Sequence, residues 1–338
     1  MKVYSAIDLH SNNSVLDVID EVGQLRHEKR YPNELSIIVE ALQPYREDLV
    51  GVVVESTYNW YWLVDGLMAA GFRVHLAHTA AVPQYAGLKH GNDYTDARHL
   101  ANLLRLGILP EGHIYPLEQR GLRDLFRKRS TLVREQTRHG LSLHALWTRH
   151  TGRQLSARDL RHLTAEQLIN KFSDVHVRQS ATVSLRLWQS LHREIQTLER
   201  SARQEMKHSP ALAHLQSTPG IGDILGLTIL LETGQIERFD SVGDYASYCR
   251  CVDSLRLSNG KPKGHGNAKS GNRYLAWAYI EAANFAIRFS PPIHRWYERK
   301  RRRCHRMVAL KAVAHKLARA CYFMLREQVD FNLERAFS

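Results

Sequence analysis

The chain has 338 residues, of which 43% are hydrophobic, the proportion of an ordinary globular protein rather than a disordered one. It contains no apolar run of about 18 residues and no charged-then-apolar leader, so we expect a cytoplasmic protein without a membrane span. The four cysteines are too few and too unevenly spaced for a disulfide framework.

The net charge of +13 is divided unevenly along the chain. Residues 1–116 carry 9 Lys and Arg against 14 Asp and Glu, and the remaining residues carry 38 against 20. A strongly basic surface attracts the phosphate backbone of nucleic acids. The sequence therefore predicts an acidic first domain followed by a part that binds nucleic acid.

The first predicted domain, residues 1–116, combines strands and helices. Its opening reads as three short strands separated by turn residues, at 2–9, 13–20 and 24–31. The later pattern alternates, with a helix after Pro32, a strand at 50–54, a helix near 58–70, a strand at 72–77, a short helix near 80–87 and a helix near 93–107. This order is that of a ribonuclease-H-like mixed sheet, although flavodoxin-like sheets share its second half.

The second predicted segment, residues 117–209, is a helical arm, because it contains no proline and has apolar residues at helical spacing. Near its end a coiled-coil spacing recurs at Trp188, Leu191, Ile195, Leu198 and Ala202. This spacing fits the packing face of a helix pair as well as it fits a dimer interface.

The third segment, residues 210–338, is predicted to be mainly helical. The turn Pro219-Gly220-Ile221-Gly222 joins two helical patterns in the manner of a helix-hairpin-helix, whose glycines let backbone N–H groups approach a phosphate, although such turns also serve as plain connectors. A loop rich in glycine, lysine and serine follows at 258–272, then an apolar helix from Arg273 to about Phe289. After a break at Pro291-Pro292 we expect one last helix, rich in Lys and Arg and suited to nucleic-acid contact.

Four carboxylates stand at the ends of predicted elements in the first domain. Asp8 and Glu55 end two apolar strands, and Asp93 and Asp96 open the helix near 93–107 on one face. Helix capping explains the last two when they are taken alone, but it does not explain acids at strand ends. Carboxylates that converge at the carboxyl ends of the strands bind hard divalent cations, so we predict a site that can hold two divalent ions. His10 is interpreted as a loop residue rather than a ligand.

Ser258 is a second candidate, because a serine in a cationic loop can attack a phosphodiester while lysine and arginine stabilise the transition state. Most loop serines have no covalent role, and the residue pattern alone leaves this one open. The predicted nucleic-acid-binding cations lie in the same loop, at the start of the helix that follows it, and in the last helix: Lys261, Lys263, Lys269, Arg273, Arg299, Arg302 and Arg303.

The motifs, taken in order, resemble those of the DEDD transposases of bacterial insertion sequences, the IS110 family, which are bridge-RNA-guided DNA recombinases. In the first domain the resemblance rests on Ala6-Ile7-Asp8, Val54-Glu55 and Asp93-Tyr94-Thr95-Asp96-Ala97. In the last domain it rests on the Pro-Gly-Ile-Gly turn, on Arg238-Phe239-Asp240-Ser241, and on the Ser258 loop with Lys269-Ser270-Gly271-Asn272.

The resemblance implies a RuvC-like domain that binds Mg²⁺ through Asp8, Glu55, Asp93 and Asp96, and a covalent phosphoserine link between Ser258 and DNA during strand exchange. It further implies donor and target DNA and a structured bridge RNA as partners, in a dimer or tetramer assembled through the helical arm.

The chain departs from the family pattern around the serine. Arg250-Cys251-Val252-Asp253 stands where the family usually has Gly-Leu-x-Pro, and Asn259 rather than glycine follows Ser258. These departures leave Ser254 as an alternative nucleophile. They are also compatible with a degenerate copy of the transposase that has lost its activity.

The sequence thus predicts an RNA-guided, metal-dependent DNA transposase or recombinase. Two other interpretations stay open. One is a structure-selective nuclease, such as a junction resolvase, in which the serine is a bystander. The other is a non-catalytic nucleic-acid-binding protein with a helix-hairpin-helix.

Overall fold

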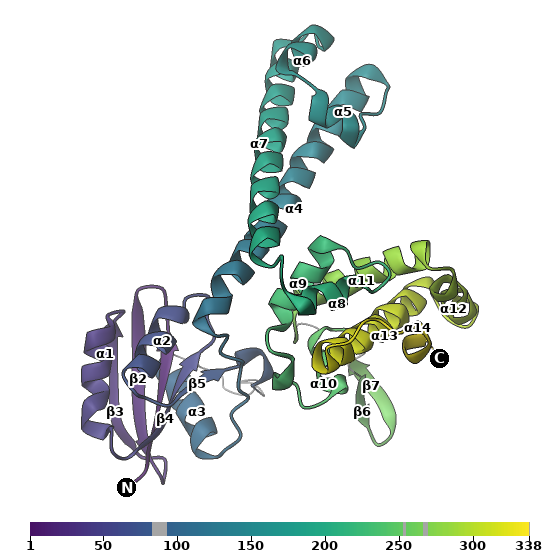
Figure 1. The fold of residues 1–338 in the computed structure, drawn as a ribbon. Coiled ribbons are helices and arrows are strands. Elements are labelled where there is room, and N and C mark those ends of the chain that lie inside the picture. The colour runs from purple at the N-terminus through teal and green to yellow at the C-terminus, as the bar shows by residue number, and fades with distance from the viewer. Residues whose placement is uncertain (83–92, 253–254, 266–269, 338) are drawn as a thin grey trace. The chain divides into compact units, whose positions relative to one another are not determined.

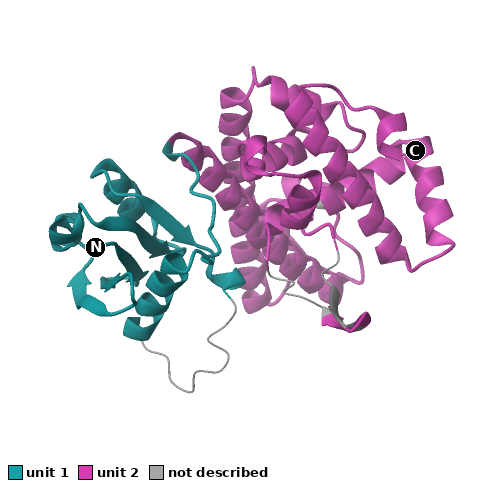
Figure 2. Ribbon diagram, turned by 90° about the horizontal axis from the view of Figure 1, so that it is seen from below, with its two compact units in different colours: residues 1–117 teal, residues 118–338 magenta. Residues whose placement is uncertain are grey.

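The computed structural model describes residues 1–82, 93–252, 255–265 and 270–337, and these are the residues discussed below. The chain divides into two compact units, Met1–Leu117 and Glu118–Ser338 (Figure 2). Each unit is described by itself. Within the described residues, no helix has the length and apolarity that crossing a membrane requires.

The first unit is built on a five-stranded mixed sheet in the order β3-β2-β1-β4-β5 (Figure 1). β1 (Val3–Leu9), β2 (Asn13–Asp20) and β3 (Leu25–Pro32) form an antiparallel meander, and β4 (Leu49–Glu55) and β5 (Val74–Ala77) continue the sheet in parallel with β1. Nearly all residues of β1 and β2 are buried, because helices cover both faces of the sheet. The expected α/β class of this part, with a mixed sheet, is confirmed.

Two helices cover one face of this sheet and one helix covers the other. α1 (Leu35–Leu42) and α2 (Tyr61–Ala69) share a buried cluster with Ile7, Leu16 and Val52, among others. α3 (Asp93–Arg105) packs on the opposite face, where Leu100 meets Ala6 and its neighbours. Short 3₁₀ turns, η1 (Gln43–Tyr45) and η2 (Thr79–Ala81), complete the unit, and most of the predicted helix near 80–87 lies outside the described residues.

β3 differs from the other strands because it is the edge of the sheet. Its sequence is rich in charged residues, and most of its side chains are exposed. At the opposite edge, Ala77 of β5 forms an isolated antiparallel bridge with Glu111.

The second unit opens with a long helical arm. α4 (Leu117–Thr151) and α7 (Val175–Glu205) are its two long helices, joined through α5 (Ala157–His162) and α6 (Ala165–Lys171). The two long helices approach closely where Gly140 faces Trp188, since a Cβ on Gly140 would lie 3.1 Å from the indole ring. The seam predicted from coiled-coil spacing therefore packs within the chain around Trp188.

The remainder of the second unit is a helical bundle with one small hairpin. Its elements are α8 (Pro210–Gln216), α9 (Asp223–Thr233), η3 (Ile236–Arg238), α10 (Val242–Tyr248), β6 (Leu255–Ser258), β7 (Lys261–His265), α11 (Arg273–Phe289), α12 (Pro291–Arg301), α13 (Arg306–Glu327) and α14 (Leu333–Phe337). α11 and α13 form the centre of the core, where buried alanines such as Ala282 and Ala314 let helices pack closely.

Two expectations for this part were wrong. Of the segment expected to be a loop at 258–272, residues 258–265 belong to the β6–β7 hairpin, because Asn259-Gly260 supplies a tight turn. The basic run expected in one last helix is split between α12 and α13. The second helix starts afresh with the His305 ring accepting a hydrogen bond from the Met307 N–H.

Candidate active site

Asp8 and Glu55 lie next to each other at the carboxyl ends of two adjacent strands. β1 and β4 are parallel neighbours in which Ala6 pairs with Val53 and Ile7 with Val54, so the two acids are the next residues on adjacent strands. Side chains alternate between faces along a strand, and both carboxylates therefore lie on the same face as Ala6 and Val53, the face that α3 covers.

α3 brings two more acids to this edge. Asp93 and Asp96 form its first turn, and its buried residues include Ala97, Leu100 and Ala101. Positions three and four apart share one face of a helix, so the stripe that packs on the sheet begins with the two carboxylates. The first turn of α3 consequently lies near the carboxyl ends of β1 and β4, where Asp8 and Glu55 are located.

The pKa values of Glu55 and Asp96 are raised, in part because these acids lie close to one another. Burial, a hydrogen bond with Asp8 and repulsion from Asp8 and Asp96 raise the pKa of Glu55 to about 8. Burial, with repulsion from Asp8 and then Asp93, also raises the pKa of Asp96. All four predicted acids therefore belong to one interacting group.

Asp93 is held by two basic side chains. Nε2 of His10 lies 3.3 Å from Oδ2 of Asp93 and 3.3 Å from Oδ2 of Asp8, and Nη2 of Arg30 donates to Oδ2 of Asp93 at 2.5 Å. The hydrogen bond from Arg30 is the main cause that lowers the pKa of Asp93. Potential ligand atoms of Asp8, His10 and Asp93 all lie within 4.8 Å of one another, which is close enough for one cation to contact all three.

The sequence analysis missed His10 as a member of this group, and it missed Arg30 altogether. His10 lies two residues beyond Asp8, the spacing that returns a side chain to the same face of an extended chain. Arg30 pairs with Val15, which pairs with Asp8, so the three residues form one row across three strands. The spacing that places His10 near Asp8 was visible in the sequence. The position of Arg30 became clear only from the register of β1, β2 and β3.

An open groove of about 470 Å³ adjoins the acids. Its lining includes His10, Asn12, Arg30, Asp93 and the ring of Tyr58, whose exposed fraction is 83%. A cationic guanidinium and an exposed aromatic ring beside carboxylates are suited to a nucleic-acid strand, whose phosphates and bases they can contact.

Ser258 occupies the tip of the β6–β7 hairpin. It is the last residue of β6, and its backbone pairs with Lys261 across the turn. Asn259 and Gly260 both have positive φ, 52° and 71°, which is the pattern of a two-residue type I′ turn. The alternative nucleophile Ser254 lies outside the described residues.

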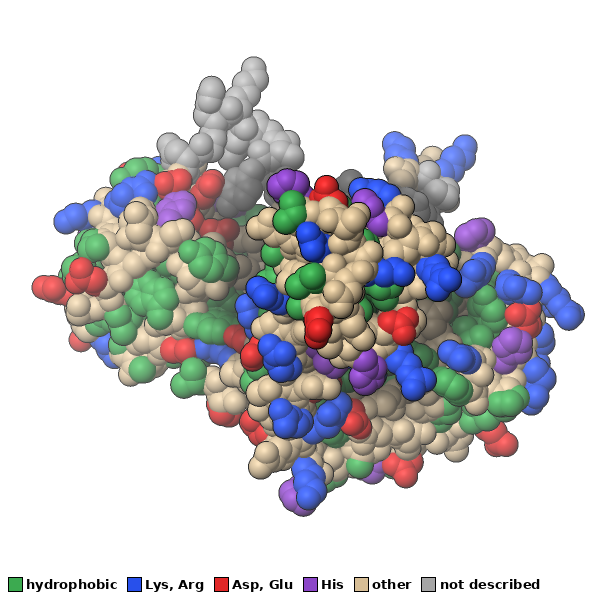
Figure 3. Space-filling view, turned by 90° about the horizontal axis from the view of Figure 1, so that it is seen from above, with side chains coloured by type: hydrophobic (Ala, Val, Ile, Leu, Met, Phe, Trp, Pro, Cys, Tyr) green, Lys and Arg blue, Asp and Glu red, His purple; other side chains and the backbone are tan. Residues whose placement is uncertain are grey.

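The predicted nucleic-acid-binding cations lie at several places in the second unit. Lys261 and Lys263 are exposed on β7, Arg273 opens α11, and Arg299, Arg302 and Arg303 are exposed at the end of α12, while Lys269 lies outside the described residues. Figure 3 shows many Lys and Arg side chains on the visible face of this unit.

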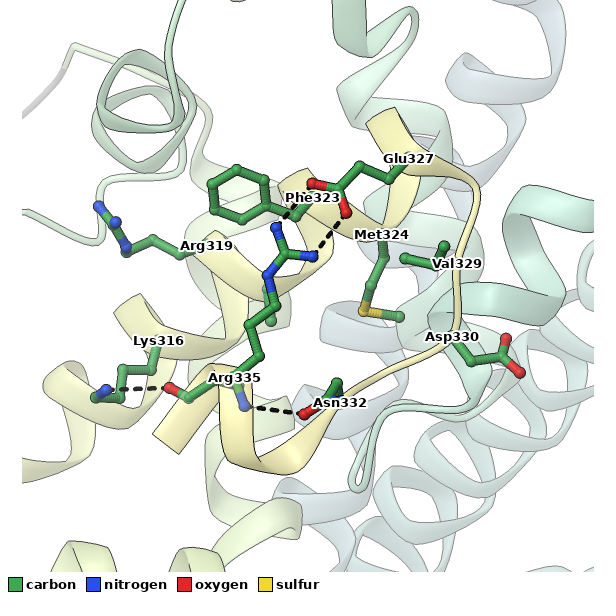
Figure 4. A pocket seen from close by; sticks show the side chains of 11 residues that line it. Lys316, Arg319, Phe323, Met324, Glu327, Val329, Asp330, Asn332 and Arg335 are labelled. Carbon is green, nitrogen blue, oxygen red and sulfur yellow. Dashed lines mark hydrogen bonds and ion pairs between the residues drawn. The ribbon is translucent and has the colours of Figure 1, made fainter. Parts of the chain in front are cut away.

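Two hollows on α13 add further cations. One, of about 450 Å³, is lined by Lys300, Lys311 and His315 together with apolar side chains. The other, of about 430 Å³, lies between α13 and the C-terminal segment (Figure 4). In that second hollow Arg335 is engaged by Glu327 through two hydrogen bonds of 2.6 and 2.8 Å. The first hollow, with no acid in its lining, is therefore the better suited to an anion.

The Pro-Gly-Ile-Gly turn uses its two glycines differently. Gly220 has a φ of +91°, and a Cβ there would lie 2.5 Å from the Ala282 carbonyl oxygen, so this glycine serves the packing of the turn on α11. A Cβ on Gly222 would meet no described atom within 4 Å. The open backbone at Gly222 leaves room for the phosphate approach that the sequence suggested.

Comparison with known protein families gives two matches along the chain. A transposase model for DEDD transposases of the IS110 type matches residues 6–151, and the model of the transposase IS116/IS110/IS902 family matches residues 212–298. A comparison with curated proteins gives no match. The first match contains all four acids of the site, and the second contains the Pro-Gly-Ile-Gly turn and the serine hairpin. Because the two matches together span more than half of the sequence and agree in family, the chain belongs to the IS110 family of transposases, enzymes that act on DNA.

Proposed function

We propose that this transposase is an RNA-guided DNA recombinase that joins DNA strands through Ser258, assisted by divalent cations at the acids of its RuvC-like first unit. The observation that carries the proposal is the crowding of Asp8, Glu55 and Asp96 at one edge of the sheet, beside Asp93. Donor DNA, target DNA and a structured bridge RNA are the proposed partners, in a dimer or tetramer.

The chemistry of the donor set fits Mg²⁺ or Mn²⁺. Both ions prefer oxygen ligands. Burial and mutual repulsion keep Glu55 protonated, and a cation that replaced this proton would offset the repulsion between the carboxylates. Asp8, Glu55, Asp93 and Asp96 would hold the metal, with His10 as a further ligand. A bound divalent cation supplies Lewis-acid stabilisation of the phosphate oxygens.

The residues of the chain would then share the strand transfer as follows. Ser258 Oγ loses its proton and forms an ester bond with phosphorus, and the bond to the leaving DNA oxygen breaks, with that oxygen taking up a proton. Attack by the hydroxyl of another strand on the phosphoserine ester reverses the process, so no net hydrolysis is required. Lys261 and Lys263, exposed just beyond the hairpin turn, stabilise the negative charge on the phosphate.

The serine is tested by trapping the covalent adduct. Protein, cognate RNA and labelled DNA are combined with Mg²⁺ and separated on a denaturing gel. The proposal expects the adduct with the unaltered protein and with Ser254→Ala, and its loss with Ser258→Ala. A Ser258→Ala variant that still cuts DNA would instead identify a hydrolytic nuclease.

The acids are tested separately from DNA binding. Asp8→Asn and Asp96→Asn should each abolish cutting while leaving DNA retention unchanged. Asp65→Asn, on α2 at the opposite face of the sheet, serves as the matched control and should cut normally. Omitting the RNA should prevent recombination at the chosen target site, and recombination that proceeds equally well without it would refute RNA guidance.

A further inference from the structure

The two ends of the segment that carries the Ser258 hairpin are tied together. Nε and Nη2 of Arg250 donate to the carbonyl oxygen of Gly271 at 3.1 and 2.8 Å. The backbone N–H of Asn272 donates to the carbonyl of Tyr248 at 2.6 Å, at the end of α10. Gly271 has a φ of +87°, and a Cβ there would lie 2.6 Å from the same Tyr248 carbonyl. The positions that flank the hairpin segment in sequence therefore form a closed and tightly packed base.

Asn272 connects this base to α9. Its Oδ1 accepts hydrogen bonds from the N–H groups of Tyr274 and Leu275 and so caps α11. Its Nδ2 donates to Oε2 of Glu232 at 2.7 Å. Asn272 and Glu232 are buried, with exposed fractions of 7% and 3%, so the bond between them is shielded from water.

Glu232 in turn connects α9 to the arm. Nε and Nη2 of Arg127, on α4, donate to the two oxygens of Glu232 at 2.6 and 2.7 Å. The guanidinium group also lies 5.0 Å from the centre of the Tyr274 ring. A forked pair of this kind fixes direction as well as distance, because both bonds lie in the planes of the two groups.

The base of the arm is also held by apolar packing at this point. Leu122 and Phe126 of α4 share a buried cluster with Leu212 of α8 and Leu227 of α9. To this apolar packing the forked ion pair adds a directional contact, because its two parallel hydrogen bonds depend on the orientation of both groups.

We propose that Arg127, Glu232 and Asn272 are positioning residues that couple the orientation of the arm to the Ser258 hairpin. The inference rests on the proposed role of Ser258 in strand transfer. A change in the direction of α4 would be passed through Glu232 to Asn272, the residue next to Gly271 in the tied base. Asn272, from the Lys-Ser-Gly-Asn motif, thus acts through other residues and contacts no reacting atom.

The α4 helix itself provides a matched control. Arg129, two residues beyond Arg127, forms an ion pair of 2.6 Å with Glu199 of α7, and both of these side chains are largely buried. This pair joins the two arm helices and has no bond to Asn272. Arg129→Met therefore removes an ion pair from α4 while leaving the link to the hairpin intact.

The test combines amide hydrogen exchange with adduct trapping on the full chain. Arg127→Met should speed exchange of peptides covering 255–265 at least tenfold and lower the phosphoserine–DNA yield at least tenfold. Arg129→Met should leave both unchanged. Arg127→Lys, which keeps the charge but not the fork, should fall between the two.

Folding of the variants is controlled by a double substitution. Arg127→Met combined with Glu232→Gln leaves no unpaired buried charge, so the chain keeps its fold while the link is lost, and it should behave as Arg127→Met does. Hairpin exchange equal to that of the unaltered protein in this double variant would overturn the proposal, whether or not adduct is lost. Absence of adduct in the unaltered protein would refute the proposed serine chemistry instead, and the exchange comparison would still decide the coupling.

Discussion

Glu55 should make the metal-free first unit less stable as the pH rises. Its carboxyl has a pKa of about 8 in the folded protein against an ordinary value of 4.5, because it is buried and crowded by Asp8 and Asp96. Between these two values the folded state retains a proton that the unfolded chain releases. Stability therefore falls with rising pH across this window, and Glu55→Gln should remove the fall.

The size of the effect follows from the two pKa values. At pH 7 the unfolded carboxyl is about 2.5 pH units above its pKa, and about 1.36 kcal/mol per unit gives an upper limit of about 3 kcal/mol. Glu55 is only half-buried, so solvent screening reduces the expected gain from Glu55→Gln to about 1–2 kcal/mol. At pH 5 the gain should be close to zero.

Hydrogen exchange of β1 and β4 in the presence of EDTA measures this gain for the first unit alone. Glu40→Gln, at an exposed position of α1, is the control and should follow the unaltered protein at every pH. If the stability of the first unit depended on pH equally in the unaltered protein and in Glu55→Gln, Glu55 would not have the raised pKa that its burial and its acidic neighbours predict. A Glu55→Gln protein less stable than the unaltered one at pH 8 would lead to the same conclusion.

Three further outcomes follow from the structure. Asp17 is fully buried, and its pKa is raised to about 7, chiefly by burial, so it too lowers stability as the pH rises from 3.8 to 7. In Asp17→Asn the urea concentration at the midpoint of unfolding should therefore depend less on pH over that range. Gly220→Ala should lower the free energy of unfolding by more than about 2 kcal/mol, because the new methyl group would strike the α11 backbone. Gly222→Ala should cost less than about 1 kcal/mol, and equal melting temperatures for the two would contradict this account. If Lys261 and Lys263 contact duplex phosphates, each change to Gln should reduce the slope of log affinity against log salt by about 0.9, and unchanged slopes would exclude the contacts.

The first unit could be predicted well from its sequence because its strands have distinct boundaries. β1 and β2 are apolar runs ended by polar turns, and the structure places them at 3–9 and 13–20, against predictions of 2–9 and 13–20. The acids at the strand ends were visible for the same reason. That Asp8 and Glu55 emerge side by side depends on the parallel pairing of β1 with β4, which no local pattern reveals.

The second unit was harder to predict where local signals conflicted or were missing. Asn259-Gly260 is a strong hairpin signal, but the glycines and lysines around it resemble a loop. The break between α12 and α13 contains neither proline nor glycine, so composition gave no reason to divide the basic helix there. The link from Arg127 to Glu232 spans 105 residues and exists only in the folded chain.

The edge strand β3 has a consequence for self-association. A free strand edge invites a second copy to extend the sheet by backbone hydrogen bonds, and like-charged side chains on that edge oppose such docking. β3 presents Lys29 there, with Arg26 paired to Asp20 and Arg30 paired to Asp93, and at the opposite edge of the sheet Glu111 already bridges Ala77. If copies of this protein assemble as proposed, the charges of β3 oppose the edge-to-edge pairing of their sheets.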